Sequence, residues 1–229
     1  MLDKWWGMRI VHTYNDVFQG VPSIGSVALA AWLVWVVVSI CLHELGHGWA
    51  AIRCGDTTPR DLGHMTLDPM KHMGIVSFVM LAVVGITWGL MPVQPDNFRR
   101  RHDDALVSLA GPAVNVLLCV VCLIGAVASL RLLSGDTMVY SYVVFTMGLQ
   151  INLIGAIFNL VPIPPLDGST ALASFVPAMK QFVRSPQAGI VGLFIMLVFG
   201  SQIVGPIIGW ASSAATSSIM YLSRVTGGH

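Results

Sequence analysis

The residues best suited to chemistry form the short motif His43-Glu44-Leu-Gly-His47, which lies inside a long apolar stretch. On a helix, residues four apart lie on one face, so His43 and His47 can direct their imidazole nitrogens at one ion. Zn²⁺ accepts such nitrogens at about 2.0–2.1 Å, and a catalytic zinc takes three protein ligands plus a water. Glu44 follows His43 around the helix and can take a proton from that water without binding the metal. The motif therefore predicts a zinc site with Glu44 as its general base.

Two other interpretations fit a polar motif inside an apolar stretch that is long enough to lie in a membrane. A histidine in an apolar helix is often only a hydrogen-bonded core residue, and an intramembrane glutamate can belong to a proton relay or an ion pathway. Glu44 is, however, the only glutamate of the chain, and it stands between two histidines at zinc spacing. A charge at bilayer depth costs about 2.5–3.5 kcal/mol or more, which a purely structural helix has no reason to carry. Metal chemistry is the favoured interpretation.

The third zinc ligand is expected to be Asp167. It follows a long stretch without charged residues and belongs to the segment Asn159-Leu-Val-Pro-Ile-Pro-Pro-Leu-Asp167-Gly168. The prolines prevent a continuous helix, and irregular backbone at membrane depth is tolerated where it lines a cavity or is covered by protein. Asp167 could instead cap the helix that follows it. The other histidines lie in polar flanks or near the termini, where exposure to solvent is the default: His12, His64, His72, His102 and His229.

Three motifs together resemble the site-2 protease family of intramembrane zinc metallopeptidases. They are His43-Glu-Leu-Gly-His47, the segment Ala110-Gly-Pro-Ala-Val-Asn115, and the segment from Asn159 to Gly168. The loops Leu62–His72 and Met91–Pro95 also resemble those of its short, compact bacterial members. The resemblance covers about Cys41 to Thr170, over half of the chain.

The resemblance implies a role for each matching residue. His43, His47 and Asp167 bind one Zn²⁺, and Glu44 is the catalytic base. Asn159 stabilises the oxyanion, as an amide donor would, and Asn115 supports the site. Some members of the family carry a PDZ-like or nucleotide-sensing domain, and no such domain is expected here.

The composition predicts an all-α polytopic membrane protein. Of 229 residues, 55% are apolar and only 10% are charged, against about 25% charged in soluble domains. The mean hydropathy is +0.76. This excludes a disordered chain, a nucleic-acid binder and an ordinary soluble domain. A helical span needs about 20 apolar residues, so we expect a bundle of about four to six transmembrane helices.

The apolar run Gly74–Met91, between the first two spans, is expected to be re-entrant or membrane-associated. If this run crossed the membrane, the helix that carries His43 and His47 and the run before Asp167 would end on opposite sides of the membrane. The three residues could then hardly bind one zinc ion. The re-entrant arrangement also places eight of the twelve Lys and Arg residues on one side of the membrane and four on the other. If every run crossed, the two sides would carry seven and five. Positive charge favours the cytoplasm, so the amino terminus is expected outside and the site nearer the cytoplasm. The larger group is Arg53, Arg60, Lys71, Arg99, Arg100, Arg101, Lys180 and Arg184.

We expect one membrane-embedded peptidase domain over residues 1–229, with a catalytic core of about 23–180 and a carboxy-terminal membrane segment of about 188–222. No removable signal peptide is expected. The four cysteines suggest neither disulfides nor metal chemistry; Cys119 and Cys122 lie in an apolar run and are expected to pack.

The predicted function is hydrolysis of peptide bonds in or near transmembrane segments of other membrane proteins. The expected partners are such a substrate and the lipid bilayer, with no nucleic acid, and the expected location is the plasma membrane of a prokaryote. The alternatives are a transporter or channel that uses the His/Glu cluster, or an inactive zinc-binding membrane scaffold. Zinc analysis together with a cleavage assay of Glu44→Gln separates these functions.

Overall fold

The computed structural model describes residues 18–183 continuously, residues 14–16, and separate residues between 185 and 217. His12, His229 and most of the expected carboxy-terminal segment 188–222 lie outside the described residues.

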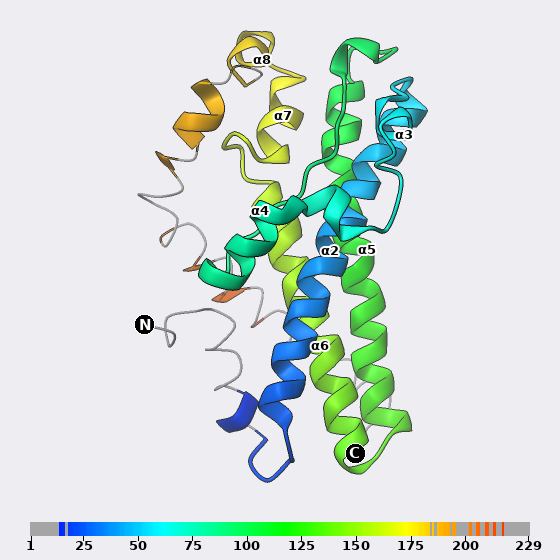
Figure 1. Ribbon diagram of the computed structural model, residues 1–229, viewed down its shortest axis with the longest axis vertical. Helices are drawn as coiled ribbons and strands as arrows, with labels where there is room; N and C mark the ends of the chain where they lie inside the picture. The colour runs from blue at the N-terminus through cyan, green and yellow to red at the C-terminus, as the bar shows by residue number, and fades with distance from the viewer. Residues whose placement is uncertain are drawn as a thin grey trace.

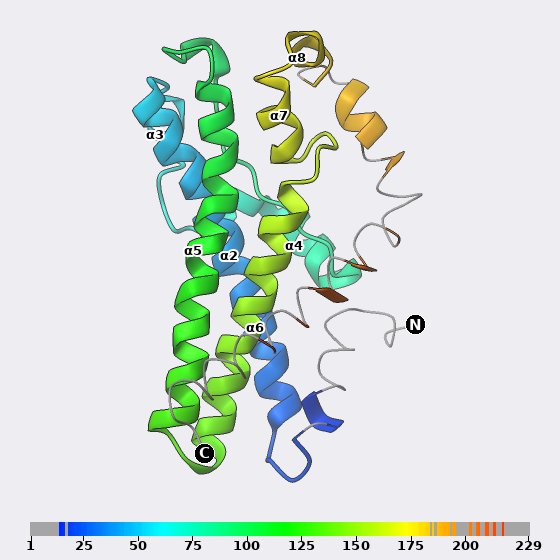
Figure 2. The same ribbon diagram turned by 180° about the vertical axis from the view of Figure 1, so that it is seen from behind.

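Three long helices form the body of the molecule: α2 (Ile24–Cys54), α5 (Asp103–Leu132) and α6 (Gly135–Asn159). Each is long and apolar enough to cross a membrane, and no other helix in the described part of the chain meets both conditions. They run in alternating directions, and α5 and α6 pack against each other along the bundle (Figures 1 and 2). The prediction of an all-α polytopic membrane protein is confirmed, with three of the expected four to six spans within the described residues.

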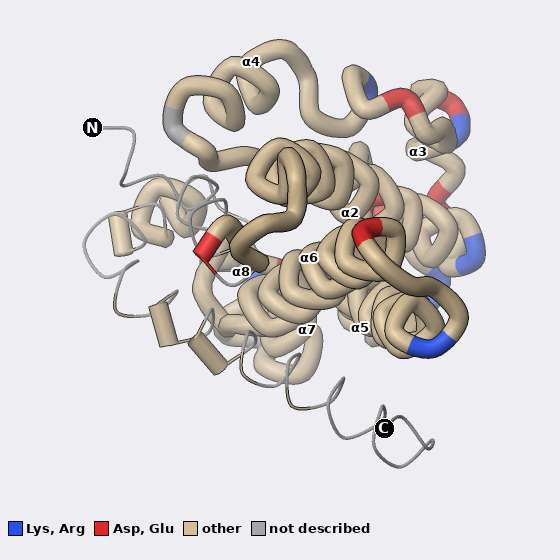
Figure 3. The backbone as a smooth tube through the Cα atoms, turned by 90° about the horizontal axis from the view of Figure 1, so that it is seen from below, with Lys and Arg blue, Asp and Glu red and all other residues tan. Residues whose placement is uncertain are grey.

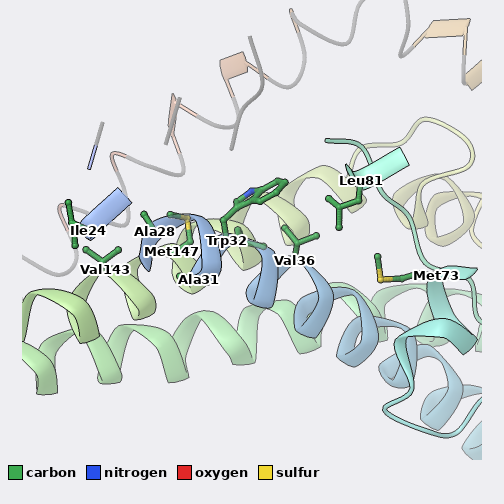
Figure 4. Packing of buried hydrophobic residues seen from close by; sticks show 10 residues of the cluster. Ile24, Ala28, Ala31, Trp32, Val36, Met73, Leu81, Val143 and Met147 are labelled. Atoms are coloured by element: carbon green, nitrogen blue, oxygen red, sulfur yellow. The ribbon is translucent and has the colours of Figure 1, made fainter. Parts of the chain in front are cut away.

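Within the described part of the chain, the largest apolar core lies where α2 faces α6. Ala28 of α2 is fully buried, as are Val143 and Met147 of α6, and Trp32 is nearly so. Figure 4 shows these side chains meeting, with Leu81 closing the same cluster from a shorter helix. Small residues such as Ala28 let apolar helices approach closely, which matters in lipid because packing rather than hydrophobicity holds the helices together.

That shorter helix, α4 (Pro69–Val84), does not run the length of the bundle. It has 16 residues and is interrupted at Gly74, where φ is 67° and ψ is 166°. A continuous helix of this length would span about 24 Å, less than the hydrocarbon core of about 30 Å. α4 lies across the middle of the bundle, and the chain then returns as an extended segment to the end where α2 stops and α5 begins (Figure 1). This is the same-end arrangement that the sequence predicts for Gly74–Met91.

A buried aspartate joins the end of α2 to the turn before α5. Asp56 is fully buried, and its carboxylate accepts hydrogen bonds from the Thr58 backbone and hydroxyl, from the Asn97 amide and from the Gln94 N–H at 2.7 Å. Burial alone would raise the pKa of Asp56, but these hydrogen bonds outweigh it and hold that pKa below its ordinary value. The carboxylate thereby holds α3 (Thr58–Asp61) and the 3₁₀ turn η2 (Pro95–Asn97) in place.

Candidate metal centre

The two histidines of the motif lie on the inward face of α2, four residues apart. Both are buried, and their Nε2 atoms are 3.0 Å apart. The Nδ1–H of His43 donates to the Asn115 side-chain oxygen at 2.7 Å, and the Nδ1–H of His47 donates to the Val107 carbonyl at 2.7 Å. Because each Nδ1 carries the proton, each neutral ring presents a lone pair at Nε2.

Asp167 completes the cluster from another part of the chain. It is the first residue of α7 (Asp167–Ala173), and its Oδ2 lies 3.2 Å from Nε2 of His43 and 3.3 Å from Nε2 of His47. The residue before that helix is Leu166, which makes no side-chain cap, so Asp167 is not the capping residue of the alternative interpretation. Gly168 lets the turn close here, because a Cβ at this position would collide with the Leu160 carbonyl.

These three atoms fit a bound cation. Both Nε2 atoms carry lone pairs, and Asp167 Oδ2 is buried without a hydrogen-bond partner, so three acceptors converge without a proton donor between them. Donors about 2.0–2.1 Å from one ion at tetrahedral angles are about 3.3 Å apart, and the observed separations are 3.0, 3.2 and 3.3 Å. Two imidazoles and one carboxylate also form a usual catalytic zinc donor set.

Glu44 lies beside the cluster and does not belong to it. Its side chain is buried, and it lines the same cavity as the two histidines. The extended segment after α4 covers it at Gly89, where an added Cβ would collide with the Glu44 carboxylate. A carboxylate next to the cluster, shielded by backbone on one side, suits a base that handles protons without binding the ion.

Two asparagines belong to the surroundings of the cluster, and only Asn115 has a hydrogen bond to one of its histidines within the described residues. Asn115 of α5 is buried and contacts His43 directly through the hydrogen bond above. Asn159, the last residue of α6, lines the cavity and donates one amide N–H to the Gly155 carbonyl at 3.0 Å. The Asn159 amide carries a second N–H.

All five predicted site residues line one cavity of about 820 Å³: His43, Glu44, His47, Asn159 and Asp167. Its remaining walls come mostly from apolar residues of α2, α6 and the extended segment from Gly85 to Met91. A largely apolar cavity of this size with a few convergent polar groups is typical of ligand-binding sites.

The close approach of α5 to the histidines depends on Gly111. A Cβ at this position would lie 2.6 Å from Cε1 of His43 and closer still to both Nε2 atoms. The glycine of the Ala110-Gly111-Pro112 segment therefore lets backbone approach the imidazoles where a side chain would displace them.

Several buried polar residues were not predictable from the sequence pattern alone. His72, expected in solvent, is only 2% exposed, and its Nε2–H donates to the Thr66 carbonyl at 2.7 Å. That expectation is wrong because the first turn of α4, which contains His72, packs against α2 and the returning segment, where the Leu90 N–H donates to the His72 carbonyl at 2.8 Å. Ser39 and Asn152 are buried between the long helices. A single serine or asparagine in an apolar stretch of sequence does not by itself indicate such a role. A weak signal was available, since Ser39 precedes His43 by one helical turn and Asn152 precedes Asn159 by two.

Cys119 and Cys122 pack between α5 and α6, as the sequence predicts. All four are free thiols, and Cys122 is fully buried in a small apolar cluster with Ala126 and Leu149. The thiol of Cys119 donates to the Leu149 carbonyl at 3.7 Å. The Cys-x-x-Cys spacing therefore serves packing between α5 and α6.

Comparison with known proteins identifies the class that this fold and cluster define. The profile of peptidase family M50 matches residues 31–141. The Bacillus subtilis protein named "Putative zinc metalloprotease YwhC" is 31% identical over 198 residues, which cover 83% of this chain and 89% of that protein. The chain therefore belongs to peptidase family M50, and the resemblance to site-2 proteases is confirmed.

A second relative has the same description. The Mycobacterium tuberculosis protein Rip2 is also named a "Putative zinc metalloprotease" and is 33% identical over 180 residues, which cover 75% of this chain and 65% of Rip2. No solved structure matches the chain significantly. The prediction of a zinc metalloprotease with multiple apolar helices is confirmed, and His43, His47 and Asp167 are the group that can hold its one Zn²⁺.

Proposed function

We propose that this protein hydrolyses peptide bonds in or beside the transmembrane segments of other membrane proteins. The observation that carries the proposal is the convergence of the three acceptor atoms and Glu44 in one largely apolar cavity among three long apolar helices. A soluble peptide would gain little from such walls, whereas an apolar segment can bury its side chains against them.

His43, His47 and Asp167 hold the zinc in this proposal. When bound, zinc supplies a water activated for attack at neutral pH and a polarised carbonyl. Glu44 takes a proton from the attacking water as its oxygen bonds to the scissile carbonyl carbon. It returns that proton to the amide nitrogen as the carbon–nitrogen bond breaks, so the products are a carboxylic acid and an amine.

Asn159 is proposed as the donor to the oxygen that becomes negative during attack. Its amide group is held at the cavity wall by the hydrogen bond to the Gly155 carbonyl. A fixed donor requires little reorganisation when the charge develops, and the loss of one such donor costs about 10²–10³ in kcat.

A helical substrate hides its amide groups in its own hydrogen bonds. It must therefore unwind locally before a carbonyl reaches the site, and helix-weakening residues near the cleaved bond favour this. The proposed partners are accordingly a membrane-protein substrate and the bilayer that holds it. We place the catalytic core at about residues 23–180, within a single domain.

The proposed orientation has the site nearer the cytoplasm of a prokaryotic plasma membrane. The charged residues lie mainly in connections and at helix ends (Figure 3). Arg53, Arg60, Arg99–Arg101 and Lys180 belong to segments at the end where α2 stops, and Arg131 lies at the opposite turn (Figure 1). The positive-inside rule assigns the first end to the cytoplasm.

Glu44→Gln tests the proposal, because the amide keeps the shape of the side chain and removes its basicity. In lipid nanodiscs we expect the variant to retain stoichiometric zinc and to lose cleavage of a membrane-anchored substrate by about 10²-fold or more. Asp136→Asn, an exposed position at the start of α6, is the matched control and should cleave like the wild type. Equal cleavage by Glu44→Gln, or the absence of zinc from the wild type, would reject the mechanism.

A further inference from the structure

A chain of hydrogen bonds leads away from the metal cluster into the middle of the bundle. His43 contacts Asn115 of α5, Asn115 contacts Ser39 of α2, and Ser39 contacts Asn152 of α6. Asn152 is fully buried, and Asn115 and Ser39 are 2% and 4% exposed. No step of the proposed hydrolysis uses Ser39 or Asn152.

The direction of every bond in this chain follows from its far end. The Asn152 side chain faces the Gly148 carbonyl at 2.8 Å, and because a carbonyl only accepts, the amide nitrogen must be the group on that side. The amide oxygen of Asn152 therefore faces Ser39, 2.9 Å away, and the Ser39 hydroxyl must donate to it.

The same logic continues to the metal ligand. The single proton of Ser39 is committed to Asn152, so Ser39 can only accept from Asn115, whose amide nitrogen lies 3.3 Å away. The Asn115 oxygen is then the group facing His43, and His43 must donate to it from Nδ1. Nε2 of His43 is left without a proton and turned toward His47 and Asp167.

We propose that Ser39 and Asn152 are positioning residues that fix the tautomer of His43 through Asn115, so that its Nε2 lone pair is available to zinc. This inference rests on the proposed function, because the tautomer affects catalysis only if His43 binds the metal. If Ser39 no longer donates to Asn152, its hydroxyl is free to donate to Asn115. The Asn115 amide can then turn around and donate to Nδ1 of His43. In that arrangement the ring proton of His43 lies on Nε2, where it blocks coordination of zinc.

Two substitutions break the chain at different places. Asn152→Leu removes the acceptor for Ser39 at similar volume, and Ser39→Ala removes the acceptor for Asn115. The matched control is Ser129→Ala, since Ser129 is a buried serine of α5 that donates only to the Gly125 carbonyl of its own helix. Full-length protein in lipid nanodiscs is used throughout, with helix content checked by circular dichroism.

The first readout is the zinc dissociation constant, measured by competition with a chromogenic chelator. Loss of an outer partner of a metal-binding histidine usually weakens binding 10–100-fold. We expect at least a tenfold rise in Kd for Asn152→Leu and for Ser39→Ala, and less than a twofold change for Ser129→Ala. The Kd of the double variant should not exceed that of the weaker-binding single variant, because both substitutions break the same chain of hydrogen bonds.

The second readout is the tautomer itself, from ¹⁵N shifts of histidine in zinc-free protein. The wild type should show His43 protonated at Nδ1, and both variants should show a population protonated at Nε2. Wild-type affinity and an unchanged tautomer in both variants would overturn the inference. If the wild type binds no zinc, the proposed function fails, and the tautomer measurement alone decides the role of Ser39 and Asn152.

Discussion

Placing one methyl group on α5 provides a severe test of the metal centre. Gly111 faces both imidazoles, and the Cβ of Gly111→Ala would lie 2.6 Å from Cε1 of His43. Carbon atoms in contact keep about 3.5–4.0 Å, so either the imidazoles or the α5 backbone must move by about 1 Å.

That displacement is large compared with what a zinc site tolerates. Ligand distances in such sites hold to within about 0.2 Å, so a shift of about 1 Å exceeds the tolerance roughly fivefold. It affects His43 and His47 together, since the added carbon would approach the Nε2 atoms of both. We therefore expect zinc affinity to fall by at least about 100-fold, the upper end of the range for a single outer-partner loss, and cleavage to fall with it.

Gly125→Ala is the matched control, on the same helix and with comparable crowding. Its Cβ would meet the Phe145 ring, away from the cluster, and its cost is overpacking of about 1–3 kcal/mol. Zinc content by elemental analysis, chelator competition and thermal unfolding are measured on both variants. The reasoning fails if Gly111→Ala binds zinc like the wild type, or if Gly125→Ala loses zinc to the same extent.

Three further predictions follow from other parts of the structure. Because hydrogen bonds hold the pKa of Asp56 below its ordinary value, its carboxylate stabilises the fold above about pH 4, and this contribution disappears as the pH falls through the lowered pKa. The difference in Tm between wild type and Asp56→Asn should therefore shrink as the pH falls below about 4. Lys180→Ala removes the half-exposed partner that lies 2.7 Å from buried Asp104, and we expect a loss of about 1 kcal/mol and faster proteolysis near α8 (Pro177–Val183). Chelation of zinc should lower Tm and abolish cleavage, and added zinc should restore both, because a ligand bound only to the folded state stabilises it.

The local pattern around the motif was sufficient to predict much of the site. The four-residue spacing of His43 and His47 places them on one helix face wherever the helix lies, and the position of Glu44 follows from the same geometry. Asp167 is more than a hundred residues away, and only its charge-free surroundings and the family resemblance indicated it. The same-end return of Gly74–Met91 was predictable because a shared metal constrains which ends of the helices must meet.

The buried polar residues could not be predicted in the same way. Whether a polar side chain is buried depends on the partner that another helix brings to it, and that partner is not written nearby in the sequence. Ser39 and Asn152 illustrate this, because each is satisfied by a residue more than a hundred positions away. His72 was misjudged for the same reason, since its burial depends on how the first turn of α4 packs against α2 and the returning segment rather than on the polar residues beside it in the sequence.

The hydrogen-bond chain from His43 to Asn152 also has a consequence for how the bundle assembles. Lipid tails are as apolar as leucine, so apolar faces discriminate poorly between one axial register of neighbouring helices and another. The chain joins α2, α5 and α6, and its partners meet only in one register. Sliding any one helix by a single turn, about 5.4 Å, would leave several polar groups unpaired in an apolar interior. The groups that prepare a ligand for zinc therefore also align the three helices along their axes.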